Sequence, residues 1–455
     1  MKTASQVLLF SDSKAIPLRV LSPEQLKSEA IKIKTMASAQ GFEAAPLALM
    51  MVPGESGETV EILVGLPSAH ADPFSLGSIS SRLPTGHYRF VPEQTCNRLV
   101  ALGWYLELYK YDPFRQVNVK EITLSCPKSI DLVDLHSAAD ATVVVRDLIN
   151  APANLLGPEE LEAAACRIAG QNDAKMEVVA GEDLKKNFPM IHVVGAASPR
   201  LPRLIDFVWG NALSPKVTLV GKGVCFDTGG LDIKPSSNML LMKKDMGGAA
   251  NVLGLAQMIM AARLNVRLRV LIPAVENSIA GNAFRPGDVF KTRKGLTVEI
   301  GNTDAEGRLV LCEALAVADE EHPDLLIDMA TLTGAARVAL GPDLPPFYTN
   351  DAALAERITS HAEAENDPVW QLPLWKPYET MIETPIADIN NAGNSGFAGS
   401  ITAALFLKRF VEHAKSYVHF DVFGWVPTAK PGRPKGGEAQ AMRALFATIK
   451  ERYPK

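Results

Sequence analysis

The sequence predicts an α/β protein of two domains, and three observations support this. The chain has 455 residues, and typical domains of about 100–200 residues suggest two or three domains. Residues 1–125 hold short apolar runs separated by Gly, Pro and Ser. From residue 176, short apolar runs alternate with helical patterns, as in a sheet with helices on both faces. We therefore expect a small N-terminal α/β domain at residues 1–128. A larger α/β domain, with a mixed sheet covered by helices on both faces, would occupy residues 129–455.

The N-terminal third contains recognisable elements but no motif that carries chemistry. Val60–Val64 predicts a strand, and Leu99–Lys110 predicts a helix. Its acidic and basic residues are mixed, which is typical of a solvated surface.

A long helix is expected to connect the two domains. Apolar residues within 129–150 recur mostly at spacings of three and four, which indicates a helix. They are Leu132, Leu135, Ala139, Val143 and Leu148. Pro152 then marks a turn, and Pro158, followed by two Glu residues, predicts the start of the next helix. The long helix within 129–150 would be the first element of the second domain.

The second domain alternates strands and helices. Its expected strands are Met176–Val179, Val217–Val220, Val266–Ile272 and Leu325–Met329, and its clearest helical patterns are Gly248–Ala262 and Leu309–Glu320. In sheets of this kind, functional sites gather at the carboxyl ends of the strands.

Composition excludes several classes of protein. Lys plus Arg is 46 and Asp plus Glu is 51, so the net charge of -5 gives no support for nucleic-acid or anionic-membrane binding. The five Cys are scattered with no CxxC pair, and the N-terminal apolar run is too short for a signal peptide. The apolar stretch Val252–Leu264 is too short and too charged to span a bilayer. We therefore expect a cytoplasmic protein without a membrane segment.

Common catalytic motifs are missing from the sequence. It contains no GxxxxGK[ST] loop, no GxSxG elbow and no HExxH helix. With only eight His and five Cys, a zinc site of the usual His and Cys type is not indicated.

Two Gly-rich segments are unusually dense in charge. They span residues 220–250 and 301–313, and each begins just after an expected strand. Asp227, Asp245, Asp304 and Glu306 sit largely among Gly, Ala, Thr and Met. Burying several carboxylates together is costly unless cations neutralise them, and a pair of divalent metal ions does so. The alternative is that Asp245 and Asp304 cap the helices that follow them.

Three basic residues accompany these carboxylates. Lys222 lies between two glycines directly after a strand, so it would extend into the carboxylate cluster as an ion-pair partner or a metal ligand. Lys234 follows in the same segment, and Arg308 could bind an anion in bidentate fashion. The alternatives are a solvent-exposed lysine and an ordinary salt bridge.

These segments resemble the signatures of the leucyl aminopeptidase family of metallopeptidases. The run NTDAEGRL at Asn302–Leu309 matches the family signature without a departure, and Gly221–Ala250 matches its wider pattern. Further landmarks are RxLxxxPAN at Arg146–Asn154, ATLTGA at Ala330–Ala335 and GSITA at Gly399–Ala403. The resemblance covers residues 145–455 and implies that 129–455 forms a linker helix and a catalytic domain that removes N-terminal residues from peptides, leucine-like ones above all.

The resemblance also implies roles for individual residues. One metal ion would be held by Asp227, Asp304 and Glu306, and the other by Lys222, Asp227, Asp245 and Glu306. Lys234 would polarise the scissile carbonyl, and Arg308 would hold a bicarbonate ion that accepts a proton. Met242, Asn302, Thr331 and Gly334 would form the substrate pocket. The family implies a cytoplasmic homohexamer that uses zinc, manganese or magnesium.

One position departs from the family pattern. Where relatives carry His-x-Asp-Ile-Ala-Gly, this chain has Phe423 in place of the small residue near the pocket. Either Phe423 alters the preference for the first residue or it packs in the core.

Two rival functions remain at this point. Paired metals also serve phosphoesterases, although a lysine ligand and the lack of His argue against that class. Some relatives bind DNA, but the net charge of -5 speaks against it here.

Overall fold

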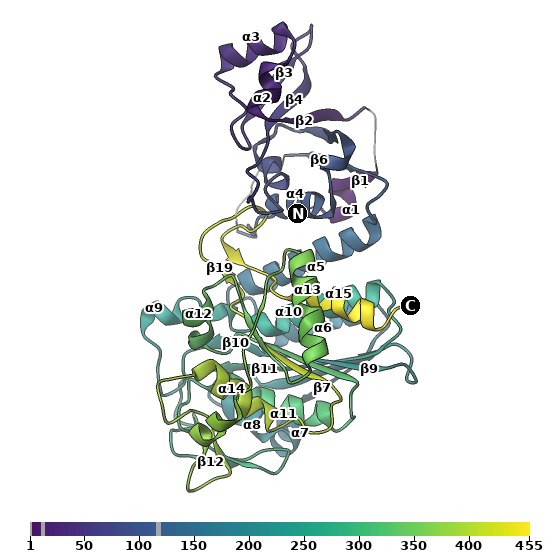
Figure 1. The fold of residues 1–455 in the computed structure, drawn as a ribbon. Helices are drawn as coiled ribbons and strands as arrows, with labels where there is room; N and C mark the ends of the chain where they lie inside the picture. The colour runs from purple at the N-terminus through teal and green to yellow at the C-terminus, as the bar shows by residue number, and fades with distance from the viewer. Residues whose placement is uncertain (1, 11–13, 115–119) are drawn as a thin grey trace. The chain divides into compact units, whose positions relative to one another are not determined.

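The computed structural model describes residues 2–10, 14–114 and 120–455. The chain divides into two compact units, Met1–Val143 with Thr428–Lys435, and Val144–Pro427 with Gly436–Lys455. Each unit combines a mixed sheet with helices, so the predicted fold class is confirmed (Figure 1). The expected long helix is present as α5 (Leu132–Asn150), and the border between the units falls within it.

The first unit is built on a six-stranded sheet in the order β1-β6-β5-β2-β4-β3. All neighbours in this sheet are parallel except β3 and β4. The strands are β1 (Leu8–Phe10), β2 (Ile16–Leu21), β3 (Leu49–Pro53), β4 (Thr59–Gly65), β5 (Gly86–Val91) and β6 (Ile122–Cys126). The helices are α1 (Ala4–Val7), α2 (Pro23–Lys27), α3 (Ile31–Gln40), η1 (Gly77–Arg82), η2 (Glu93–Thr95) and α4 (Arg98–Glu107). The strand expected at Val60–Val64 is therefore β4, and the helix expected at Leu99–Lys110 is α4.

The second unit is built on a nine-stranded mixed sheet. Its main path is β16-β15-β18-β14-β9-β11-β8-β7, and β10 pairs with β11. The strands are β7 (Lys175–Ala180), β8 (Arg203–Trp209), β9 (Lys216–Gly221), β10 (Gly223–Asp227), β11 (Arg267–Asn277), β14 (Leu325–Ala330), β15 (Pro346–Tyr348), β16 (Trp370–Gln371) and β18 (Tyr417–Asp421). The central strands β9, β10, β11, β14 and β18 run parallel, so their carboxyl ends meet at one edge.

Smaller elements complete the second unit. A three-stranded sheet joins β12 (Val289–Lys291), β13 (Thr297–Glu299) and β17 (Ile389–Asn390), and β19 (Trp425–Val426) pairs with β20 (Gly436–Gly437). The helices are α6 (Pro158–Gly170), α7 (Gly181–Asn187), α8 (Pro189–Gly195), α9 (Ser236–Met239), η3 (Met242–Lys244), α10 (Gly247–Ala261), α11 (Glu306–Asp319), α12 (Gly334–Leu340), α13 (Ala352–Ala364), η4 (Lys376–Ile382), α14 (Gly399–Lys408) and α15 (Met442–Arg452).

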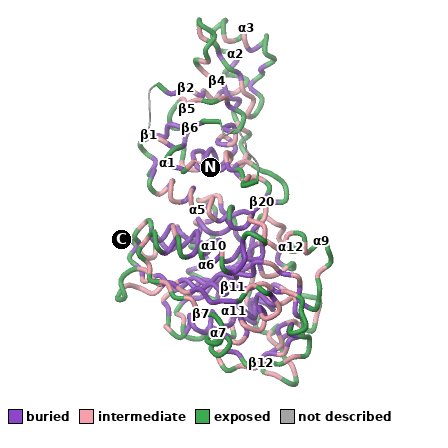
Figure 2. The backbone as a smooth tube through the Cα atoms, turned by 180° about the vertical axis from the view of Figure 1, so that it is seen from behind, coloured by how far each residue is buried: buried purple, intermediate pink, exposed green. Residues whose placement is uncertain are grey.

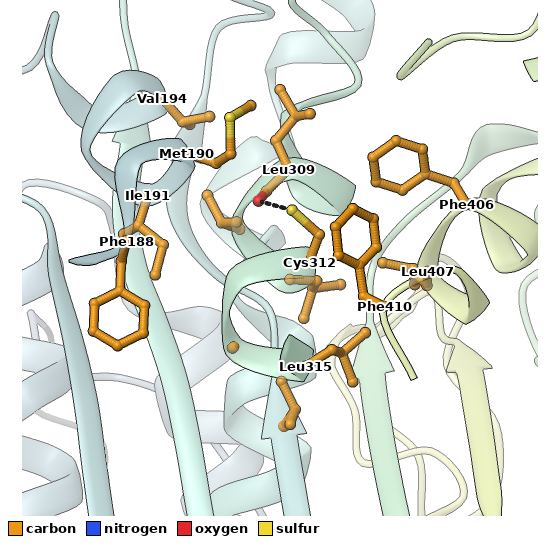
Figure 3. Packing of buried hydrophobic residues seen from close by; sticks show 14 of the residues in the cluster. Phe188, Met190, Ile191, Val194, Leu309, Cys312, Leu315, Phe406, Leu407 and Phe410 are labelled. Carbon is orange, nitrogen blue, oxygen red and sulfur yellow. Dashed lines mark hydrogen bonds between the residues drawn. The ribbon is translucent and has the colours of Figure 1, made fainter. Parts of the chain in front are cut away.

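Helices cover both faces of the nine-stranded sheet. On one face α10 packs against β9 and β14 and contacts α6 and α15, while on the other α11 packs against β9 and contacts α8 and α14 (Figure 1). Figure 2 shows that burial is densest where these helices meet the strands. In Figure 3 the apolar side chains of α8, α11 and α14 interdigitate, with Cys312 donating a hydrogen bond to the Leu309 carbonyl at 3.0 Å. The core therefore holds the parallel strands in register at the site.

Helix α11 begins three residues earlier than its apolar pattern suggested. The pattern starts at Leu309, but the helix starts at Glu306. A carboxylate in the first turn is favoured by the helix dipole, and this turn carries no apolar periodicity that would reveal it. In the described part of the chain, no helix has both the length and the apolarity needed to cross a bilayer.

Candidate functional site

A cavity of about 480 Å³ lies at the carboxyl edge of the nine-stranded sheet. Lys222 follows β9, Asp227 ends β10, Thr331 follows β14 and Phe423 follows β18, and all four line it. Of the residues proposed from the sequence, the cavity is lined by Lys222, Asp227, Lys234, Met242, Asp245, Asp304, Glu306, Thr331 and Gly334. The structure thus brings together residues more than a hundred positions apart.

The glycines of both segments make this convergence possible. A Cβ atom on Gly307 would lie 2.5 Å from Cε of Lys222, so only glycine leaves room for the lysine beside the first turn of α11. Gly229 has φ +89°, and a Cβ there would lie 2.5 Å from the Asp232 carbonyl oxygen. The chain can therefore turn after β10 and carry Lys234 back into the cavity.

Lys222 forms the centre of one half of the cluster. Its Nζ lies 2.7 Å from Oδ2 of Asp245 and 3.0 Å from Oε1 of Glu306, and it donates to the Thr331 carbonyl at 3.0 Å. Burial alone would lower the pKa of Lys222, but the carboxylates of Asp245 and Glu306 raise it above its usual value. This lysine is paired and buried, not solvent-exposed.

Lys234 forms the centre of the other half. Its Nζ lies 2.8 Å from Oδ2 of Asp227 and is also paired with Asp304. Burial opposes the charge, but Asp227 and Glu306 raise the pKa of Lys234 overall, so the ammonium stays protonated at neutral pH. The loop is fixed by the Lys234 amide, which donates to the Thr228 carbonyl at 2.9 Å.

The carboxylates are crowded and almost fully buried. Asp227, Asp245 and Glu306 each offer an oxygen within 4.8 Å of the others, and each side chain belongs to a residue no more than 2% exposed. Burial and the nearby Asp227 carboxylate raise the pKa of Asp304 to about 6 and that of Glu306 to about 8. Oε2 of Glu306 is buried without a hydrogen-bond partner in the described structure. The donor set therefore fits divalent cations, whose charge would relieve this crowding.

The alternative that these acids cap helices is wrong. The residue before α10 is Met246, the residue before α11 is Ala305, and neither helix has a side-chain cap. The Asp245 carboxylate instead accepts a hydrogen bond from the Thr331 hydroxyl at 2.8 Å. The acids are turned toward the cavity because the lysines and Thr331 hold them there.

Arg308 lines a second cavity of about 270 Å³, which shares Asp304 and Gly334 with the first. Its Nη1 donates to the Asn391 carbonyl at 2.7 Å, while Nε is buried without a hydrogen-bond partner among the described residues. Burial lowers the pKa of Arg308 to about 10, so it remains charged. Asn302 lines this second cavity and not the first, and its Oδ1 accepts from the Asp304 amide at 2.7 Å.

Phe423 lines the larger cavity and is half-buried. Nζ of Lys244 lies 4.8 Å from its ring centre, and Cζ of Arg337 lies 4.9 Å away. Burial lowers the pKa of Lys244 to about 8. The departure from the family pattern therefore falls on the wall of the cavity.

Three residues of this site were not anticipated from the sequence. Asn277 ends β11 beside Asp227 and donates a hydrogen bond to its Oδ1 at 2.8 Å. The sequence signal that could have identified Asn277 is a polar residue at the end of an apolar strand. Lys244 directly precedes Asp245 in the charge-dense segment, which was also a signal. Arg337 lies in α12 beyond ATLTGA, and no sequence pattern marked it.

Comparisons with known proteins match most of both units. A model of the catalytic domain of the cytosol aminopeptidase family matches residues 143–446, and a model of the M17 aminopeptidase N-terminal domain matches residues 16–127. A protein of Roseiflexus castenholzii described as a probable cytosol aminopeptidase is 41% identical over 367 residues, which cover 77% of this chain and 74% of that protein.

Two solved structures resemble this one closely. The crystal structure of the cytosol aminopeptidase from Coxiella burnetii has a TM-score of 0.93 and 42% identity, covering 98% of this chain and 99% of that one. The bottromycin maturation enzyme BotP in complex with Mn has a TM-score of 0.86 and 30% identity, covering 96% and 99%. With its buried carboxylate cluster at the sheet edge, the chain belongs to the cytosol aminopeptidase family and is a metal-dependent aminopeptidase, a metallo-exopeptidase.

Proposed function

We propose that the enzyme is dinuclear and releases leucine-like N-terminal residues from peptides. The observation that carries this is the cluster of Asp227, Asp245 and Glu306, whose oxygens lie within 4.8 Å of one another and whose side chains are buried. With Lys222 neutral as a ligand and Lys234 still charged, the four carboxylates of Asp227, Asp245, Asp304 and Glu306 would leave about three negative charges, more than one divalent ion neutralises.

The ligand sets follow the family resemblance. Asp227, Asp304 and Glu306 would hold one ion, and Lys222 with Asp227, Asp245 and Glu306 would hold the other. When bound, zinc, manganese or magnesium supplies the acidification of water that peptide hydrolysis near neutral pH requires. Lys222 would have to release its proton to become a ligand, which the positive charge of an ion favours.

Lys234 and Arg308 have distinct proposed roles. Lys234 keeps its proton and lines the cavity, so it would stabilise negative charge that develops on the scissile carbonyl oxygen. Arg308 is charged and cannot act as a base. Its partnerless Nε instead fits the holding of a bicarbonate ion, which would accept the proton of the attacking water.

Met242, Thr331 and Gly334 would receive the first side chain, and Asn302 would shape the neighbouring wall. A Met side chain adapts to several shapes, so leucine and methionine are the expected residues. We further propose a homohexamer in the cytoplasm that acts on peptides and does not bind nucleic acid.

The reaction is tested with leucyl arylamide and its N-acetyl derivative. We expect the free amine to be required, because an acetyl group removes the amine that would bind a metal ion. A chelator should abolish release of leucine, manganese or zinc should restore it, and metal analysis of the active protein should approach two ions per chain. Equal rates on the acetylated substrate would refute the proposal.

A further inference from the structure

Among the described residues, two cations that line the larger cavity form no ion pair. The four carboxylates there are paired with Lys222 and Lys234. Lys244 and Arg337 also line the cavity, yet within the described structure their side chains form neither an ion pair nor a hydrogen bond. One region of the cavity therefore carries two cations with which no carboxylate of the described residues forms an ion pair.

Phe423 brings these two cations together. Both lie within 5 Å of its ring centre, at 4.8 Å for Lys244 and 4.9 Å for Arg337. Attraction to the ring face holds a cation in place but contributes no negative charge. Lys244 is only 5% exposed, and a buried cation without an ion-pair partner is costly, so an anion that enters here gains affinity.

The surrounding wall is apolar. Leu241 and Met242 line the same cavity as Phe423. A side chain with a short aliphatic stem and a carboxylate end matches this combination, because the methylenes contact the apolar wall and the carboxylate meets the cations. Glutamate has that form, and aspartate is one methylene shorter.

We propose that Lys244 and Arg337 are specificity residues that bind the carboxylate of an acidic N-terminal residue. The enzyme then releases glutamate and aspartate in addition to leucine-like residues. This inference rests on the proposed aminopeptidase function of the same cavity. Glutamine is the matched comparison, because it has nearly the same shape as glutamate without the charge. A charge-assisted hydrogen bond distinguishes the two by about tenfold in kcat/KM.

The test compares glutamyl, glutaminyl and leucyl arylamides on the manganese-loaded full chain. We expect glutamyl to exceed glutaminyl about tenfold, and high salt to reduce the ratio. Arg337→Gln and Lys244→Met should each move the ratio toward one. Arg285→Gln removes a charge from an exposed side chain outside the cavity and serves as the matched control, with the wild-type ratio expected.

The outcomes separate the two proposals. Hydrolysis of the leucyl substrate with glutamyl no better than glutaminyl overturns this inference alone. A glutamyl-to-glutaminyl ratio that stays at the wild-type value in both Arg337→Gln and Lys244→Met also overturns it, because another group must then bind the carboxylate. If Lys244→Met does not fold, Arg337→Gln still tests the inference, because Arg337 is exposed and its replacement should not prevent folding. Failure to hydrolyse any unblocked substrate with any metal instead refutes the proposed function.

Discussion

The two units bury different kinds of polar side chain. Among the described residues of the first unit, the buried polar side chains are uncharged hydroxyls, those of Ser75, Ser80, Ser125 and Thr142. The second unit buries charged groups, and its carboxylate site alone contains Lys222, Asp227, Lys244, Asp245 and Glu306. Both units are α/β folds, so the difference does not come from the fold class.

Buried hydroxyls and buried charges differ in their energetic cost. A buried hydroxyl is satisfied by one hydrogen bond, as when Ser80 donates to the Trp104 carbonyl at 3.0 Å. Buried charges are costly even when paired, and hydrophobic replacements often match their stability. The buried charges of the second unit that gather at the strand ends therefore line its cavity, while the described core of the first unit is packed from apolar side chains.

The largest expected effect is on the packing of the first unit. Trp104 is fully buried, and its ring centre lies 6.0 Å from that of Tyr88 and 6.2 Å from that of Phe90. Trp104→Ala leaves a cavity and should lower the free energy of unfolding of this unit by about 3–5 kcal/mol. Hydrogen exchange of the β5 and α4 amides measures this loss of stability. Trp104→Phe should lower the free energy of unfolding by less than Trp104→Ala. If Trp104→Ala instead lowered hydrogen-exchange protection in the sheet of the second unit, the proposed contrast between the two units would be wrong.

The next largest expected effect is on the turnover rate and not on stability. Lys234→Ala should lower kcat about a hundredfold to a thousandfold, because it removes the charge proposed to face the developing oxyanion. Metal content and thermal unfolding should change little. Lys185→Ala, an exposed lysine of α7, is the control and should retain full turnover. Turnover that survives Lys234→Ala would contradict the proposed role, and loss of bound metal would make Lys234 part of the metal site.

Much of this contrast was visible in the sequence. Each Gly-rich segment follows an expected strand, and the carboxyl ends of the parallel strands β9 and β10 bring Lys222 and Asp227 to one edge of the large sheet. The strand before Asp304 and Glu306 is β13, which belongs to the three-stranded sheet. Charges among small and apolar neighbours indicate burial, and the structure buries Asp227, Asp245 and Glu306 and leaves Asp304 partly exposed. The strand–helix alternation likewise predicted the sheet with its two helical layers.

What the sequence could not show depends on tertiary contacts. Lys244 and Arg337 lie near the same aromatic ring, that of Phe423, which comes from a third segment of the chain. The pairing of Asn277 with Asp227 depends on the register between β10 and β11. Asn302 faces the Arg308 cavity because the turn before α11 directs it there, and local spacing does not encode that direction.

The smallest expected effect, counted per pH unit, is a pH dependence confined to the second unit. Glu313 on α11 is fully buried, and burial raises its pKa to about 8 although the amides of Arg293 and Met190 donate to it. A folded-state pKa above the unfolded value of 4.5 means that its stabilisation is complete below about pH 4.5 and is lost as pH rises to about 8. The slope reaches about 1.4 kcal/mol per pH unit, and Glu313→Gln should flatten it in denaturant titrations. Glu320→Gln, at a half-exposed site, should leave the slope unchanged. An unaltered slope in Glu313→Gln would mean that another buried acid of this unit carries the pH dependence.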